Sequence, residues 1–172
     1  NEGNGVLQVT LAVSNGTLTL GTLSGLTFSS GDGTSDPSMT FRGLVSNVNA
    51  ALASLSYQGN SNYNGSDLLT VTTNDLGNTG QGGPLTDVDT VGITVNAVND
   101  APTNTVPGAQ SVNEDVSTAL TGISVADVDV NEGNGVLQVT LAVSNGTLTL
   151  GTLSGLTFSS GDGTSDPSMT FR

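Results

Sequence analysis

The chain contains one long segment twice, without a single difference between the copies. Residues 131–172 repeat residues 1–42, so the copies begin 131 − 1 = 130 residues apart. A period of about 20–50 residues is typical of solenoids, whereas 130 residues is the size of a whole domain. We therefore expect a tandem series of domains, of which these 172 residues cover a little more than one period.

The stretch VNAVNDAPT, residues 95–103, contains a proline and indicates a linker between domains. If it marks a boundary, residues 1–100 are the C-terminal portion of one module, without its first strands. Residues 101–172 are then the N-terminal portion of the next module, without its last strands. We expect neighbouring chains, or neighbouring modules of a continuous fibre, to complete both portions.

Thr, Val, Gly, Asn and Ser dominate the sequence, and they favour strands joined by tight turns. Apolar and polar residues alternate over residues 5–13, as in a half-buried strand. Asn15 and Gly16 predict a hairpin to the next strand. Residues 44–55 carry the only helical pattern. Further strands are predicted at residues 17–20, 26–28, 38–41, 67–73, 89–98, 109–113 and 120–127. This pattern predicts an all-β sandwich of about seven or eight strands with one short helix.

The charge of the chain limits its partners. It has 15 acidic residues and 2 basic residues, which gives a net charge of −13. Binding to nucleic acid is not expected, because phosphates require Lys and Arg. Membrane insertion is not expected either, because no apolar run approaches the roughly 20 residues that span a bilayer. Cations are the charged partners that remain.

The sequence also argues against an enzyme. It contains no His and no Cys, and both basic residues are arginines, so only carboxylates could provide acid–base catalysis. The absence of Cys excludes disulfides and thiolate metal sites. Identical copies in series suit rods and multivalent binders better than catalysts.

Three stretches resemble motifs of the cadherin family. VNAVNDAPT, residues 95–103, is similar to the linker in which an Asn-Asp pair precedes a Pro. ADVDVNEGNG, residues 126–135, resembles the Asp-x-Asp motif followed by Asn-Gly. LLTVTTND, residues 68–75, resembles the strand that ends in the Ala-x-Asp motif. Residues 44–67 are typical of the bacterial versions, so the chain resembles the cadherin-like repeats of giant secreted, RTX-type surface adhesins.

The resemblance implies that Ca²⁺ binds at the linker through oxygen ligands. Calcium takes six to eight oxygens from carboxylates, amides and backbone carbonyls. The implied ligands are Asn99, Asp100, Glu114, Asp127, Asp129 and Asn134. Asn4 is the copy of Asn134, and Asp75 would serve the preceding linker. In an extended Asp-x-Asp, two carboxylates lie on one strand face about 7 Å apart and could flank one ion.

One departure from the family reduces the expected number of ions. Cadherins carry acidic residues in a motif before the penultimate strand, where this chain has Ser56 and Gln58. We therefore expect one or two calcium ions per linker. The loop GDGTSD, residues 31–36, resembles half of an EF-hand loop but lacks its distal Glu, so a metal site is not expected there. Asp87 and Asp89 are expected to be solvent-exposed on a hairpin.

By this resemblance the chain is a structural extender of a long extracellular adhesin or filament on a bacterial cell surface. Calcium would rigidify the linkers between neighbouring identical modules. One alternative is a self-associating module whose homotypic contacts form a filament by strand exchange or edge pairing. Another is a carbohydrate-binding module, although the chain has no Trp and only two Tyr to provide a sugar platform.

Overall fold

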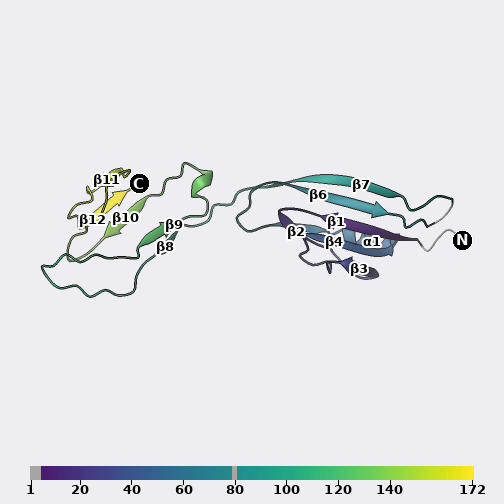
Figure 1. Cartoon of the computed structure of the whole chain (residues 1–172), viewed down its shortest axis with the longest axis horizontal. Helices are drawn as coiled ribbons and strands as arrows, with labels where there is room; N and C mark the ends of the chain where they lie inside the picture. The colour runs from purple at the N-terminus through teal and green to yellow at the C-terminus, as the bar shows by residue number, and fades with distance from the viewer. Residues whose placement is uncertain (1–4, 79–80) are drawn as a thin grey trace. The chain divides into compact units, whose positions relative to one another are not determined.

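The computed structural model describes residues 5–78 and 81–172. The chain divides into two units, Asn1–Val98 and Asn99–Arg172. The regular elements of both are mainly antiparallel β-strands, and the first also contains one α-helix (Figure 1). The predicted all-β class with one α-helix is confirmed. In the described part of the chain, no helix is both long and apolar enough to cross a membrane.

The first unit is built on a five-stranded antiparallel sheet with the order β3-β4-β1-β6-β7. Its strands are β1 (Val6–Ala12), β3 (Leu26–Ser30), β4 (Ser38–Leu44), β6 (Gly65–Asn74) and β7 (Thr86–Val95). β1 is the central strand, and its Thr10 lies opposite Thr40 of β4 and Thr72 of β6. β6 and β7 form a hairpin that is paired along the full length of both strands.

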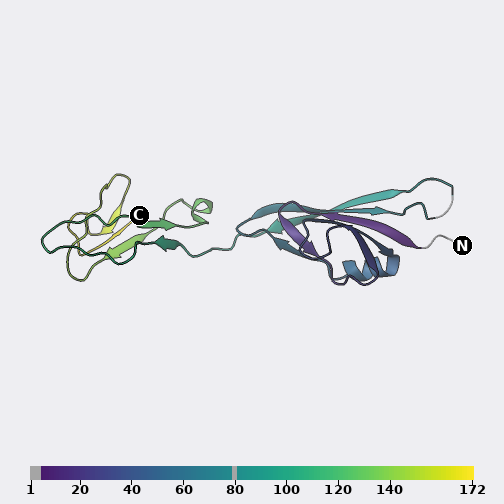
Figure 2. The ribbon, with the colours of Figure 1, turned by 60° about the horizontal axis from the view of Figure 1, so that its bottom comes forward.

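A second, smaller layer covers one face of this sheet. β2 (Gly16–Thr19) pairs with β5 (Ser56–Gly59), and α1 (Val45–Leu52) follows β4 directly (Figure 2). Buried residues of β1, β4 and β6, of α1, and of β2 and its flanks form one apolar cluster. Its members are Val9, Leu11, Val13, Leu18, Leu20, Met39, Phe41, Val48, Ala51 and Leu69. The core of the first unit therefore lies between the large sheet and this layer.

The predicted hairpin at Asn15 and Gly16 is wrong. β1 pairs with β4 and β6, whereas β2 pairs with β5 in the other sheet. The turn is thus a corner between two sheets, which a local turn signal cannot distinguish from a hairpin. A Cβ on Gly16 would come within 2.5 Å of the Tyr57 ring. The glycine is therefore required by the close approach of β5.

The second unit is less regular. β8 (Thr103–Thr105) pairs with β9 (Ser124–Ala126), and a 3-10 helix, η1 (Val130–Glu132), follows. β10 (Val139–Ala142), β11 (Phe158–Ser160) and β12 (Ser168–Phe171) form an antiparallel sheet with the order β10-β12-β11. The predicted strand at residues 109–113 is wrong, because that exposed stretch is irregular. Only the second half of the strand predicted at residues 120–127 forms.

The duplicated segment shows which features its own sequence determines. The ring centroids of Phe28 and Phe41 are 5.6 Å apart, and so are those of their copies, Phe158 and Phe171. Both copies also share the bulge between the first of these Phe residues and the Ser two positions later. Burial differs, however: Phe41 has no exposed surface, whereas Phe171 is only half-buried. The hairpin geometry is therefore local, as is the burial of Met39 and Met169, which have no exposed surface in either copy. Full burial of Phe41 depends on the rest of the first unit.

This contrast predicts different costs for the same substitution in the two copies. Phe41→Ala should lower the free energy of unfolding of the first unit by roughly 3–5 kcal/mol, because it opens a cavity in a closed core. Both tyrosines, Tyr57 and Tyr63, lie in the first unit, so tyrosine fluorescence during urea denaturation follows that unit alone. Phe171→Ala is the matched control and should leave this transition unchanged. Equal shifts from the two substitutions would contradict the account.

Candidate functional site

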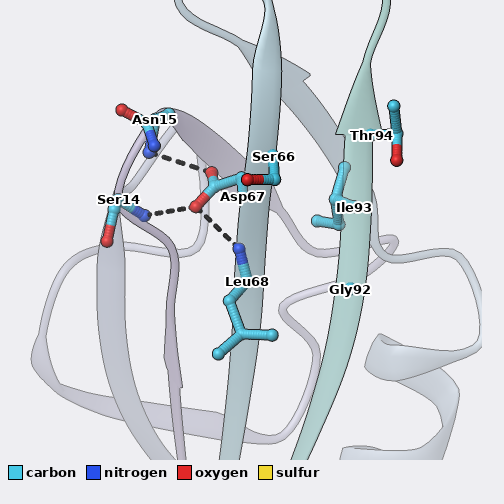
Figure 3. A pocket seen from close by; sticks show the side chains of 8 residues that line it. All are labelled: Ser14, Asn15, Ser66, Asp67, Leu68, Gly92, Ile93 and Thr94. Carbon is cyan, nitrogen blue, oxygen red and sulfur yellow. Dashed lines mark hydrogen bonds between the residues drawn. The ribbon is translucent and has the colours of Figure 1, made fainter.

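Asp67 on β6 is the buried charged side chain of the described residues, with 6% of its surface exposed. Its Oδ1 accepts hydrogen bonds from the backbone N–H groups of Ser14, at 3.0 Å, and Leu68, at 2.8 Å. Its Oδ2 accepts one from the N–H of Asn15, at 2.9 Å, and one from the Tyr57 hydroxyl, at 3.0 Å. Figure 3 shows the three bonds from the backbone. Asp67 therefore joins β6 to the β1–β2 corner and to β5.

Hydrogen bonding controls the charge state of this carboxyl group. Burial by itself would raise the pKa of Asp67, but the hydrogen bonds from Asn15, Ser14, Leu68 and Tyr57 outweigh it and lower the pKa below the ordinary 3.8. The pKa of Tyr57 is raised from its usual value by burial, and further by the hydrogen bond and negative charge of Asp67. The pair is therefore a carboxylate with a protonated phenol at neutral pH.

An open pocket of about 540 Å³ lies beside Asp67, between the β1–β2 corner and the ends of β6 and β7 (Figure 3). It is lined by Ser14, Asn15, Ser66, Asp67, Leu68, Gly92, Ile93 and Thr94. A carboxylate has about four lone-pair sites, and those of Asp67 already receive four hydrogen bonds from the protein. Asp67 therefore holds the corner between the two sheets and has no lone pair left for a ligand in the pocket.

Four of the implied calcium ligands lie together in the second unit. The Asn99 Nδ2 donates to the carbonyl oxygen of Asp100, at 3.2 Å. The backbone N–H of Asp100 donates to Oδ2 of Asp129. The N–H of Asp129 in turn donates to Oδ1 of Asp127, at 2.9 Å. The linker residues and the Asp-x-Asp motif, 29 positions apart, are thus brought to one place.

The expectation that Asp127 and Asp129 share one face of an extended strand is wrong. β9 ends at Ala126, and Asp129 has φ −96° and ψ −3°. The Asp127 side chain accepts a hydrogen bond from the backbone two residues ahead, which is an Asx turn. The short Asp side chain offers the backbone N–H a hydrogen bond that replaces one in a strand ladder, and the strand therefore ends here.

The remaining predicted ligands do not join this group into an acidic cage. Glu114 is exposed in a turn, and Oδ1 of Asn134 accepts from the N–H of Val136, at 3.0 Å. Asn4 lies outside the described residues. In residues 5–78 and 81–172, no three acidic side chains are placed to hold one metal ion together. The linker group therefore fits calcium only in part and would need further oxygens, such as backbone carbonyls or water.

Asp75 closes the loop between β6 and β7. Its Oδ1 accepts from the N–H groups of Gly77, at 2.9 Å, and Leu85, at 2.8 Å. These two hydrogen bonds lower the pKa of Asp75, against a smaller opposing effect of burial. The residue thus has a structural role in the loop that follows its strand.

The loop at residues 31–36 also uses its carboxylates internally. Oδ2 of Asp36 accepts from the N–H groups of Asp32, at 2.9 Å, and Gly33, at 2.7 Å. Oδ1 of Asp32 accepts from the N–H of Thr34, at 2.9 Å. The second copy repeats these bonds, with Asp166 in the place of Asp36. The carboxylates therefore hold the turn itself, and backbone hydrogen bonds between Asp36 and Leu18 attach the loop to β2.

The comparisons with known proteins give one partial similarity. A family model described as the Protein GAMETE EXPRESSED 2 domain matches residues 4–81, which is less than half of the chain. The matched region contains all of β1 to β6, and so includes the corner held by Asp67. No curated protein and no solved structure was found to match the chain.

The Asp67 corner makes a prediction about acid stability. Because the folded-state pKa of Asp67 is below 3.8, the unfolded state binds more protons in acid. The stabilisation by Asp67 is therefore complete well above pH 3.8 and is lost as the pH falls below that value. Asp67→Asn should unfold at lower urea concentration near neutral pH, and the gap to wild type should shrink below about pH 4.

The measurement is urea denaturation, followed by tyrosine fluorescence, at a series of pH values. Asp89→Asn removes the same charge from an exposed position on β7 and is the control. It should not reproduce the gap. A gap for Asp67→Asn that stays constant down to strongly acidic pH would contradict the assignment.

Proposed function

We propose that the chain is a stretch of tandem cadherin-like modules that act as structural extenders in a long extracellular adhesin or filament. The observation that carries the proposal is the identity of residues 1–42 and 131–172 at a spacing of domain size. Serial identical domains lengthen a rod or multiply a binding site. In this reading the module is not an enzyme, and the presentation of a distal domain on a bacterial surface is its role.

The arrangement of the first unit supports a sandwich-type module. The apolar cluster lies between the five-stranded sheet and the layer of β2, β5 and α1. Two faces packed over one core are typical of β-sandwiches, in which core residues alternate with exposed ones. The division of the chain between Val98 and Asn99 supports a module boundary inside the predicted linker, residues 95–103.

We further propose that calcium rigidifies this linker. Asn99, Asp100, Asp127 and Asp129 would hold the ion, with the remaining oxygens from backbone and water. The proximity of Asp100 to Asp129 supports this set. The net charge of −13 supports it too, because a divalent cation would reduce repulsion between acidic modules.

No observation favours the carbohydrate-binding alternative. Both tyrosine hydroxyls have partners within the protein: Tyr57 with Asp67, and Tyr63 with the carbonyl oxygen of Ser66, at 2.6 Å. Edge pairing through β7 is also disfavoured. Asp87 and Asp89 are exposed on that edge strand, and charges on an edge oppose pairing between chains.

The calcium proposal predicts a gain in stability that depends on the linker residues. A ligand that binds only the folded state at a hundredfold excess over its Kd stabilises by about 2.7 kcal/mol. Thermal unfolding should therefore shift upward in millimolar Ca²⁺ and return in excess chelator. The double substitution Asp127→Ala and Asp129→Ala should abolish the shift.

The chain supplies a matched control for this experiment. Asp87, Val88 and Asp89 form the same Asp-Val-Asp tripeptide as residues 127–129. Replacing Asp87 and Asp89 by Ala removes the same two charges from an exposed strand and should leave the calcium shift intact. If calcium has no effect on the wild-type chain, the linker is a simple hinge. If both double variants lose the shift equally, the effect is one of net charge alone.

A further inference from the structure

The dipeptide Asn-Gly occurs five times in the sequence, beginning at Asn4, Asn15, Asn64, Asn134 and Asn145. It is the dipeptide most open to spontaneous deamidation, because glycine has no Cβ to hinder attack by its own backbone nitrogen. Asn15 and Asn64 both belong to the described part of the first unit. Their surroundings can therefore be compared within one folded body.

Deamidation is an intramolecular reaction followed by hydrolysis. The backbone nitrogen of the glycine attacks the side-chain amide carbon of the asparagine and gives up its proton, and ammonia leaves. The product is a five-membered succinimide, which water opens at either carbonyl to give aspartate or isoaspartate. The attack requires the peptide between the two residues to rotate relative to the asparagine side chain. A peptide that is fixed on both sides cannot do this without local unfolding.

The peptide between Asn15 and Gly16 is fixed on both sides. The N–H of Asn15 donates to Oδ2 of Asp67, at 2.9 Å (Figure 3). The carbonyl oxygen of Asn15 accepts from the Tyr57 hydroxyl, at 3.0 Å, and from the N–H of Asn60, at 2.9 Å. Gly16 is buried, and a Cβ there would lie 2.5 Å from the Tyr57 ring. Rotation of this peptide would therefore break the corner held by Asp67.

The peptide between Asn64 and Gly65 has a more open setting. Both residues are exposed, and Gly65 has φ +131°, a conformation that glycine adopts without strain. Gly65 lies opposite Val95 in the terminal pair of the β6–β7 ladder. The ends of a ladder open more readily than its middle. A Cβ on Gly65 would have the Tyr63 hydroxyl as its nearest neighbour, at 3.2 Å, so the glycine is less tightly enclosed than Gly16.

We infer that Asn64 is a site of spontaneous deamidation in the folded chain, and that the Asp67 corner protects Asn15 from the same reaction. Deamidation at Asn64 adds one negative charge to a chain whose net charge is already −13. The isoaspartate product also lengthens the backbone by one methylene group, directly before β6 begins at Gly65. The inference involves neither calcium nor the extender role, so it holds or fails separately from them.

Peptide mapping of the whole chain tests the inference. The chain is incubated at mildly alkaline pH, folded in buffer and unfolded in urea, and samples are cut with a protease that cleaves before Asp. Asn15 then lies in the peptide 1–31 and Asn64 in the peptide 36–66. Asn145, the copy of Asn15, lies in the peptide 129–161, which differs in mass from the peptide 1–31. Tandem mass spectrometry locates the deamidated residue in each peptide.

The expected result is a difference between the two sites that depends on folding. In urea Asn15 and Asn64 should deamidate at similar rates, because both precede glycine. In the folded chain Asn64 should react at least about tenfold faster than Asn15, because only the Asn15 peptide must first leave a hydrogen-bonded corner. Equal rates in the folded chain, or a faster reaction at Asn15, would overturn the inference.

Two variants test the role of the corner. Asp67→Ser removes the acceptor of the Asn15 N–H and should raise the rate at Asn15 at least about fivefold, with the rate at Asn64 unchanged. Asp89→Ser removes the same charge from an exposed position on β7 and is the matched control, which should leave both rates unchanged.

Tyr57→Phe keeps the test decisive if Asp67→Ser prevents folding. This variant retains the ring beside Gly16 and loses only the hydroxyl that donates to Asn15 and Asp67. It should raise the rate at Asn15 by a smaller factor than Asp67→Ser does. A rate at Asn15 that neither variant raises would refute protection by the corner.

Discussion

The pairing of β1 with β6 is the interaction on which the rest of the first unit depends. It places β1 in the centre of the sheet, where Leu11 is closed from solvent, and it brings Asp67 to the β1–β2 corner. In the second copy β10, the counterpart of β1, is four residues long, against seven for β1. The length and burial of this strand are therefore set by a partner distant in the sequence, as is common for β-structure.

Asp67 shows how a charged residue can stabilise a corner between two sheets. Its four hydrogen bonds come from the β1–β2 turn, from β5 and from β6 itself, so the carboxylate joins both layers. A buried carboxylate is tolerated only when its lone pairs are satisfied, and here they are. The consequence is that the β1–β2 turn, whose Asn-Gly sequence resembles a hairpin, instead redirects the chain between layers.

Local patterns in the sequence predicted the elements better than their partners. The alternation in residues 5–13 and the apolar positions of residues 44–55 led to β1 and α1, because those periods reflect which face is buried. Strand pairing and the corner at Asn15 could not be predicted from local sequence, since they depend on residues far away in the chain. The burial of Asp67 could have been predicted. Residues two apart in a strand lie on the same face, so Asp67 shares the apolar face of Leu69 and Val71. At the linker, the motifs grouped Asp100 with Asp129, and the structure has a hydrogen bond between these two residues. The motifs gave no sign of the Asx turn at Asp127.

The most direct test of this account is NMR-detected hydrogen exchange of the whole chain, with the two copies of the duplicated segment labelled separately. Their amides have the same neighbours, so their intrinsic exchange rates are equal and any difference in protection is due to structure. The account predicts strong protection of the amides of Val9 and Leu11 within β1, and much weaker protection of those of Val139 and Leu141. The loops at residues 31–36 and 161–166, which have the same hydrogen bonds, should show similar protection. Equal protection of the two copies along β1 and β10 would contradict the claim that pairing with β6 protects β1.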